Sequence, residues 1–109
     1  MSGNLDDLLA RAEEIREKYD ELNAKNGKDV WGAKDYAMGF VGDVGDLMKL
    51  VSAKENVRDI DDLDVKLAHE LADCLWSVLI LANQYGVDLD KTFQETMDDI
   101  ERKISGAAA

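Results

Sequence analysis

Two pairs of carboxylates with helical spacing are the residues of this chain best suited to chemistry. Asp43 and Asp46 form the first pair, and Glu70 and Asp73 form the second. Within each pair the side chains are three positions apart, which on an α-helix places them on one face about one turn apart. Two such helices packed face to face would gather four oxygen donors around one point. A site of this kind suits a hard divalent cation, most plausibly Mg²⁺.

Four helical segments are expected to position these pairs, because apolar residues recur every three or four positions along most of the chain. The first runs from Leu5 to the stop signal Asn26-Gly27, and the second from about Ala33 to Lys54. The third begins at Asp62 or Asp64, either of which could cap it, and ends at Tyr85-Gly86. The fourth begins after Asp88, a candidate N-cap. Hydrophobic residues make up 46% of the chain, aromatic residues only 6%, and proline is absent. This composition favours an all-α class over a β-sandwich.

The length of 109 residues predicts a single domain spanning 1–109, with a core at about 5–104 and a flexible tail at 105–109. The third segment is apolar around more than half of its circumference, which is typical of a helix at the centre of a bundle or an oligomer. Trp76 points away from the carboxylates and is expected at an interface. The fourth segment carries one narrow apolar stripe, made of Leu89, Phe93, Met97, Ile100 and Ile104. We therefore expect a four-helix bundle that is completed by oligomerisation.

Charge and composition exclude several classes of function. The formal net charge of −11 argues against binding of nucleic acid polymers and against docking on anionic membranes. The longest apolar stretch, Cys74 to Ala82, is too short to span a bilayer, and the polar, acidic N-terminal residues do not resemble a signal peptide. Cys74 is the only cysteine and has no disulfide partner within the chain, so a reducing, cytoplasmic location is expected.

A helical projection places the two acidic pairs in matching positions. Asp43 and Glu70 each lie at the edge of an apolar stripe, and Asp46 and Asp73 lie one step further out. A carboxylate at an apolar margin is costly unless something compensates its charge, so the matching positions favour a shared cation. The plainer alternative is an acidic surface, with nearby basic side chains as ion-pair partners. Those side chains are Lys49, Arg58 and Lys66.

Two further residues are candidates for contacts with a substrate. Lys54 lies on the same line of its helix as Asp43 and could reach a phosphate, although a cation at a helix C-terminus is also explained by the helix dipole. Ser77 follows Asp73 by one turn and could face a nucleotide. Lys66 precedes Glu70 by one turn, and this spacing favours an ion pair with it over a contact with phosphate.

The segment 40–47 resembles the first motif of the all-α nucleoside triphosphate pyrophosphohydrolases, a superfamily that includes MazG, dimeric dUTPases and dCTP pyrophosphatase. The signature of this superfamily is Glu-x-x-Glu followed by Glu-x-x-Asp on the next helix. Here the first pair reads Asp43 and Asp46, and the second reads Glu70 and Asp73. The segments 70–76 and 85–89 are similar to the third helix of the family and the turn after it. The resemblance covers roughly residues 30–104.

The resemblance implies a MazG-like protein that hydrolyses a nucleoside triphosphate, canonical or non-canonical, to a monophosphate and pyrophosphate. The four acids would bind Mg²⁺, with Mn²⁺ as an alternative, and Asp43 or Glu70 would accept a proton from the attacking water. Trp31 matches a position where some members stack an aromatic ring on the base, although it also fits a packing role at a helix entry. Members are homodimers or homotetramers, with the substrate near a subunit interface.

The chain departs from the family pattern at three places. Gly42 stands where many members have a second glutamate, and both acids of the first motif are aspartates, one methylene shorter than glutamate. The lysine and asparagine that the family often carries on its fourth helix are replaced by Thr96 and Ile100, which leaves Arg102 as a candidate for phosphate binding. Two alternatives to an enzyme therefore remain open: a non-catalytic MazG-like module that binds nucleotides or proteins, and an acidic bundle without a site.

Overall fold

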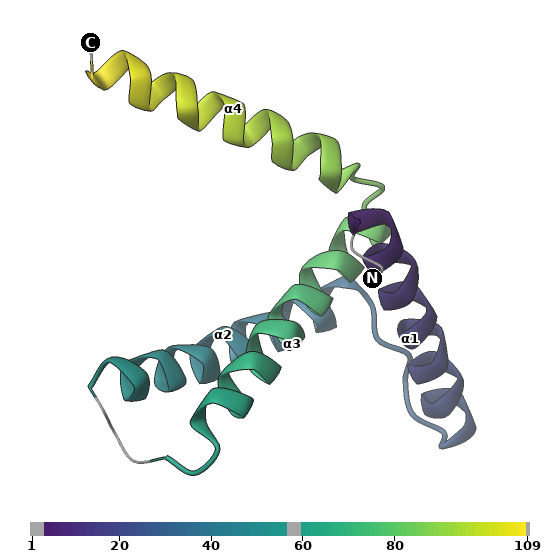
Figure 1. The fold of residues 1–109 in the computed structure, drawn as a ribbon. Helices are drawn as coiled ribbons and strands as arrows, with labels where there is room; N and C mark the ends of the chain where they lie inside the picture. The colour runs from purple at the N-terminus through teal and green to yellow at the C-terminus, as the bar shows by residue number, and fades with distance from the viewer. Residues whose placement is uncertain (1–3, 57–59, 109) are drawn as a thin grey trace.

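The computed structural model describes residues 4–56 and 60–108, and these residues form four α-helices and no β-strand. The helices are α1 (Leu5–Lys25), α2 (Ala33–Glu55), α3 (Leu63–Gln84) and α4 (Leu89–Ala108), as Figure 1 shows. The predicted all-α class is confirmed, and the starts of the helices and the ends of α1, α2 and α3 lie within one or two positions of those expected. Residues 105–108, which were expected to belong to a flexible tail, continue α4.

Local capping explains where three of the helices begin. Asn4 Oδ1 accepts a hydrogen bond from the Asp7 amide at 2.8 Å, and the Asp35 carboxylate accepts one from the Gly32 amide at 2.9 Å. Asp88 Oδ1 accepts one from the Lys91 amide at 3.2 Å, so the predicted cap of the fourth helix is confirmed. Asp62 precedes α3 in a left-handed conformation with φ of 55°, and its side chain makes no capping hydrogen bond. None of the helices is long and apolar enough to cross a membrane.

Helix α3 is the centre of the fold, because both α1 and α2 pack against it. The main buried cluster joins Ala12 of α1, Tyr36 of α2, and Leu79 and Ile80 of α3. Trp76 packs against this cluster: its ring centroid lies 5.4 Å from that of Tyr36, edge to face, and its Nε1 donates a hydrogen bond to the Ala12 carbonyl at 3.2 Å. Trp76 therefore makes these contacts within the chain, although the sequence analysis expected it at an interface.

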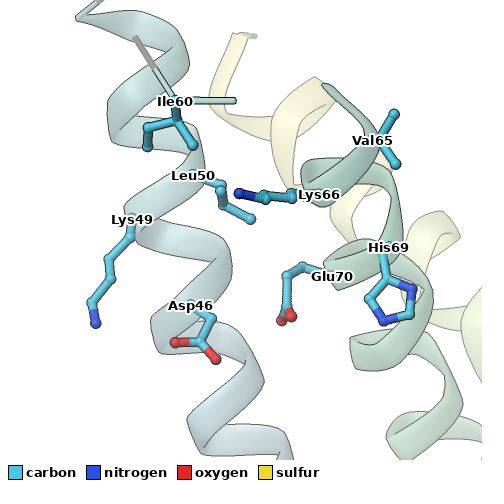
Figure 2. Close-up of a pocket in the computed structure, with 8 residues that line it drawn as sticks. All are labelled: Asp46, Lys49, Leu50, Ile60, Val65, Lys66, His69 and Glu70. Carbon is cyan, nitrogen blue, oxygen red and sulfur yellow. The ribbon is translucent and has the colours of Figure 1, made fainter. Parts of the chain in front are cut away.

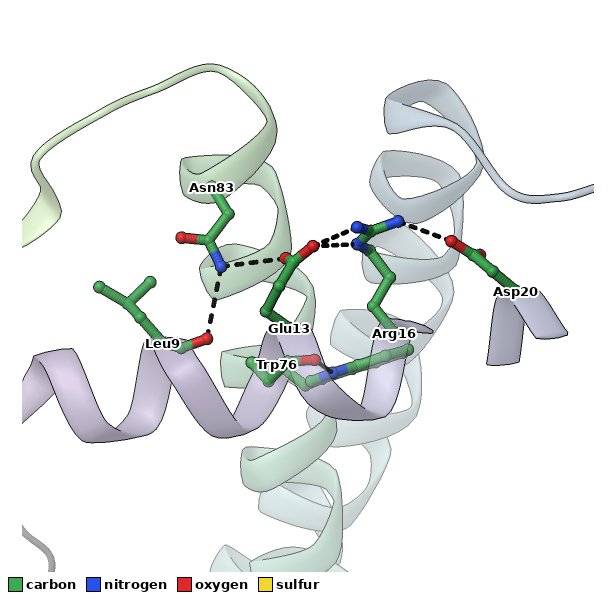
Figure 3. A network of polar contacts seen from close by, with 7 residues as sticks. Leu9, Glu13, Arg16, Asp20, Trp76 and Asn83 are labelled. Carbon is green, nitrogen blue, oxygen red and sulfur yellow. Dashed lines mark hydrogen bonds and ion pairs between the residues drawn. The ribbon is translucent and has the colours of Figure 1, made fainter. Parts of the chain in front are cut away.

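A polar network fastens α1 to the C-terminal half of α3 (Figure 3). Asn83 Nδ2 donates to the Leu9 carbonyl at 3.4 Å and to Glu13 Oε2 at 3.2 Å. Arg16 pairs with Glu13 and, at 2.7 Å, with Asp20. Its guanidinium lowers the pKa of Glu13, chiefly through the hydrogen bond between them. These contacts hold α1 over the C-terminal half of α3 and leave the N-terminal half of α3 to α2.

Helix α4 does not join the other three within one chain. It extends away from α1 and α2 in Figure 1, so no four-helix bundle is closed by a single copy. Its predicted apolar stripe is exposed over Phe93, Met97, Ile100 and Ile104, with exposed fractions between 40% and 64%. An exposed apolar stripe on this scale is typical of a helix that packs on a partner surface.

The buried cluster predicts where stability is concentrated. Ile80 is completely buried, so Ile80→Ala should lower the free energy of unfolding by about 2 to 5 kcal/mol. Val65→Ala is the matched control on the same helix: Val65 is 70% exposed, and its loss should change the free energy by less than about 0.5 kcal/mol. Urea denaturation measures both values, and equal effects would contradict this description of the core.

Candidate metal centre

The contact between α2 and α3 brings three of the four predicted carboxylates together. Asp43 and Asp46 of α2 and Glu70 of α3 each offer one oxygen, and these three oxygens all lie within 4.8 Å of one another. Oxygens that share one Mg²⁺ at about 2.1 Å are roughly 3 to 4 Å apart. Small side-chain rotations would therefore bring these donors to ligand distances, so the residues present fit the cation that the sequence predicts.

Glu70 occupies the position closest to the helix contact. Its carboxylate extends into the space between α2 and α3, beside Asp46, as Figure 2 shows. One of its oxygens, Oε2, is buried and has no hydrogen-bond partner among the described residues. A buried carboxylate oxygen without a donor is unfavourable, and a cation would supply the missing interaction.

The electrostatics of the cluster lead to the same conclusion. Burial, followed by the charges of Asp73 and Asp46, raises the pKa of Asp43 above its usual range. Burial also raises the pKa of Glu70, together with the charges of Asp43, Asp73 and Asp46. The neighbouring carboxylates therefore make ionisation of Asp43 and of Glu70 harder, which is the condition that a divalent cation relieves.

The fourth carboxylate has a different partner. Asp73 Oδ2 lies 3.2 Å from His69 Nε2, one turn earlier on α3, and Asp73 is not among the three clustered residues. The side chain of His69 is 73% exposed, and the sequence analysis did not identify its contact with Asp73. The spacing of i and i+4 could have indicated this contact. The charge of Asp73 still raises the pKa of Asp43 and of Glu70, so it remains within electrostatic reach of the cluster.

The other predicted substrate contacts are dispersed. The Lys54 ammonium pairs with Asp64 at 2.6 Å, and Arg102 pairs with Asp99 on α4, which extends away from α2. Ser77 is buried, with 4% of its surface exposed, one turn after Asp73. Trp31, in contrast, lines a cavity.

That cavity is aromatic, and we call it the aromatic cavity. It has a volume of about 370 Å³ and is lined by Tyr19, Asn23, Lys28, Trp31, Tyr36 and Trp76. Trp31 packs edge-on against Tyr36, with 5.4 Å between the ring centroids. Tyr36 precedes Asp43 by seven positions, which places it on the same side of α2 about 10 Å away along the axis. The sequence analysis identified Trp31 but missed the other aromatic residues, although the two-turn spacing of Tyr36 and Asp43 was a usable signal.

A second pocket lies beyond the carboxylates, toward the loop between α2 and α3. We call it the lysine pocket; its volume is about 630 Å³, and it is lined by Asp46, Lys49, Leu50, Ile60, Val65, Lys66, His69 and Glu70 (Figure 2). The ion pairs expected for Lys49 and Lys66 are not formed with any described residue, because none of the salt bridges within 4.0 Å involves them. Arg58, the third expected partner, lies outside the described residues.

Metal binding should be visible in thermal stability. At a Mg²⁺ concentration about 100-fold above the dissociation constant, the melting temperature should rise by roughly 10 to 20 °C. Glu70→Gln should abolish most of this rise and, without metal, should melt above the wild type at pH 7, since it removes one repelling charge. Differential scanning calorimetry with and without EDTA measures both effects. A Mg²⁺ response that survives in Glu70→Gln would exclude this cluster as the binding site.

The same repulsion predicts a dependence on pH. Because the folded-state pKa values of Asp43 and Glu70 are raised, the folded protein without metal should be stabilised as the pH falls toward the ordinary carboxylate range, and this gain should disappear as the pH rises through the raised values. Mg²⁺ affinity should change in the opposite direction, because the ligands bind as carboxylates. Calorimetric titration between pH 5 and 8 would test this, and an affinity that does not fall toward pH 5 would contradict it.

Comparison with known proteins provides the family. The model of the MazG nucleotide pyrophosphohydrolase domain matches residues 7–105. No curated protein and no solved structure matches the chain significantly. The match spans all of α2 and α3 and most of α1 and α4, and it includes every residue of the carboxylate cluster and of both pockets. The chain belongs to the MazG nucleotide pyrophosphohydrolase domain family.

Proposed function

We propose that the chain is a Mg²⁺-dependent enzyme that hydrolyses a nucleoside triphosphate to a nucleoside monophosphate and pyrophosphate. The observation that carries this proposal is the convergence of Asp43, Asp46 and Glu70 within 4.8 Å in a MazG domain. A divalent cation held there would neutralise part of the triphosphate charge and acidify a water molecule. The chain's own contribution is to hold the donors in place and to exclude water around Glu70.

Proton transfer is assigned to Asp43 or Glu70. Hydrolysis forms a bond from a water oxygen to the α-phosphorus and breaks the bond from that phosphorus to the oxygen bridging to the β-phosphate. The proton released by the water needs an acceptor near the reacting atoms. Both carboxylates belong to the cluster that would hold the cation, so either lies near a water molecule bound there. Asp73, held by His69, would bind the cation after its side chain turns toward the cluster.

The base of the nucleotide is assigned to the aromatic cavity. Its aromatic rings offer faces and edges on which any nucleobase can stack, and stacking of this kind is worth about 1 to 3 kcal/mol per base. The separation of about 10 Å along α2 between Tyr36 and Asp43 leaves room for the sugar between the base and the α-phosphate. Trp31 has 46% of its surface exposed, and it is the expected stacking partner.

The active form is proposed to be a homo-oligomer, in which a second copy covers the outer face of α2. This face is opposite the one that packs on α3 and carries Met38, Val41 and Met48, which are 66%, 71% and 63% exposed. Gly42 and Gly45 lie between them, and a Cβ at either position would meet no atom within 4 Å. Glycine within a helix costs about 1 kcal/mol relative to alanine, so two uncrowded glycines suggest close approach by a partner helix.

A second candidate function is a MazG-like module that binds nucleotides without hydrolysing them. The contact between Asp73 and His69 favours it, since it removes one carboxylate from the cluster. The shorter side chains of Asp43 and Asp46 favour it as well.

A panel of canonical and oxidised nucleoside triphosphates, assayed for pyrophosphate release, separates the two functions. We expect Mg²⁺-dependent release with at least one nucleotide, and a loss of at least about 100-fold in kcat for Glu70→Gln and for Asp43→Asn. Asp73→Asn should also reduce turnover if Asp73 joins the cation during the reaction. Mg²⁺-dependent nucleotide binding without release of pyrophosphate from any member of the panel would favour the binding module.

The oligomer is tested by changing the outer face of α2. Val41→Asp places a charge on this face and should convert the oligomer to a monomer in light scattering after size exclusion. Val65→Asp is the control, because Val65 is equally exposed, at 70%, on the other helix. A wild-type protein that is monomeric at micromolar concentration, or an oligomer that Val41→Asp leaves intact, would show that a second copy does not bind this face.

A further inference from the structure

Lys66 is a basic side chain near the carboxylates that forms no ion pair with any described residue. It lies one turn before Glu70 on α3, at the spacing where a lysine and a glutamate ordinarily pair. No such pair is formed, and no described carboxylate lies within 4.0 Å of its ammonium group. In Figure 2 the Lys66 side chain extends across the space between the helices toward α2, above the carboxylates of Glu70 and Asp46.

The surroundings of Lys66 form a space large enough for a phosphate group or two. The lysine pocket has a volume of about 630 Å³, and its walls come from both helices. Lys49 lines it from α2, but Figure 2 shows this side chain running along the outer side of α2 and away from Lys66. Lys66 is therefore the cation that reaches furthest between the helices, directly beside the candidate metal ligands.

Aromatic residues, carboxylates and the lysine pocket follow one another in the same spatial order along α2 and α3. From the N-terminus of α2 it runs from Tyr36 through Asp43 and Asp46 to the lysine pocket, and α3 repeats it in reverse from Trp76 through Glu70 to Lys66. The ten positions between Trp76 and Lys66 correspond to about 15 Å along the helix. An extended nucleoside triphosphate has a base at one end, a reacting phosphorus near the middle and the most negative charge at the other end, and it matches this order in one orientation only.

We propose that Lys66 binds the β- and γ-phosphates, so that pyrophosphate leaves toward the loop between α2 and α3 while the monophosphate remains at the aromatic cavity. The inference rests on the proposed function. When the bond between the α-phosphorus and the bridging oxygen breaks, the electron pair stays on that oxygen and the leaving pyrophosphate gains negative charge. The Lys66 ammonium lies where it neutralises this charge. It takes the place of the lysine that the family often carries on its fourth helix and that this chain lacks.

The test uses inorganic pyrophosphate in the presence of Mg²⁺, which requires no knowledge of the nucleotide. Calorimetric titration of the full chain should show binding, and Lys66→Met should weaken it by about tenfold to a hundredfold, the range for a charge-assisted contact. Lys66→Arg should restore most of the affinity. Lys18→Met is the matched control: Lys18 is an exposed lysine of α1 whose removal changes the net charge equally, and its pyrophosphate affinity should stay within about twofold of the wild type.

Product inhibition provides a second test, which compares Lys66 with Trp31 of the aromatic cavity. With the nucleotide that the panel identifies, Lys66→Met should weaken product inhibition by pyrophosphate and leave inhibition by the monophosphate unchanged. Trp31→Ala should do the reverse. Wild-type pyrophosphate affinity in Lys66→Met, or weaker inhibition by the monophosphate alone, would overturn the assignment of Lys66 while hydrolysis itself stands. A wild type that binds neither Mg²⁺ nor any nucleotide would overturn the proposed function, and the assignment with it.

Discussion

The mutual repulsion of carboxylates at the contact between α2 and α3 is the constraint on which the site depends. Three acidic oxygens lie within 4.8 Å of one another, and Glu70 Oε2 is buried without a hydrogen-bond partner among the described residues. Burial and the neighbouring charges raise the pKa of Asp43 and of Glu70. Such an arrangement persists only if other contacts hold the helices together. Here the apolar contact of α2 with α3 supplies them, and α1 strengthens it by fixing α3 from the other side.

The C-terminal half of α3 packs in the core, and its N-terminal half carries the candidate site. Its C-terminal half carries Trp76, Ile80 and Asn83, which bind α1 through apolar packing and hydrogen bonds. Its N-terminal half carries Glu70 and Lys66, which α1 does not cover and which therefore border open pockets. Rigid packing at one end and an accessible groove at the other is the arrangement that a binding site requires, since ligand entry needs a surface that the core does not fill.

Local patterns predicted the helices and the acidic pairs, because both depend on spacing along one helix. Periodicity located all four helices, and the projection that put Asp43 and Glu70 at apolar margins agrees with their contact in the structure. The sequence did not indicate which of several partners a side chain would contact. Asp73 turns to His69, Lys66 does not pair with Glu70, and Trp76 packs inward on Tyr36.

Each of these outcomes depends on side-chain rotamers or on contacts between distant segments, which spacing does not encode. The direction of α4 belongs to the same class, since an amphipathic stripe shows which face of a helix is suited to packing and not where that face would pack.

The charge of the chain explains why the carboxylates and the lysine pocket belong to one site. A protein with a net charge of −11 repels a polyphosphate, so the local charge must be reversed wherever the polyphosphate binds. The three clustered acids and the two lysines of the lysine pocket leave this region with one net negative charge. A divalent cation changes the sign of that charge. Without Lys66 the same region with its cation would be neutral, and the terminal phosphates would meet no net attraction. In the proposed site the cation would therefore act at the reacting phosphorus, and Lys66 would act at the terminal phosphates, which carry most of the charge.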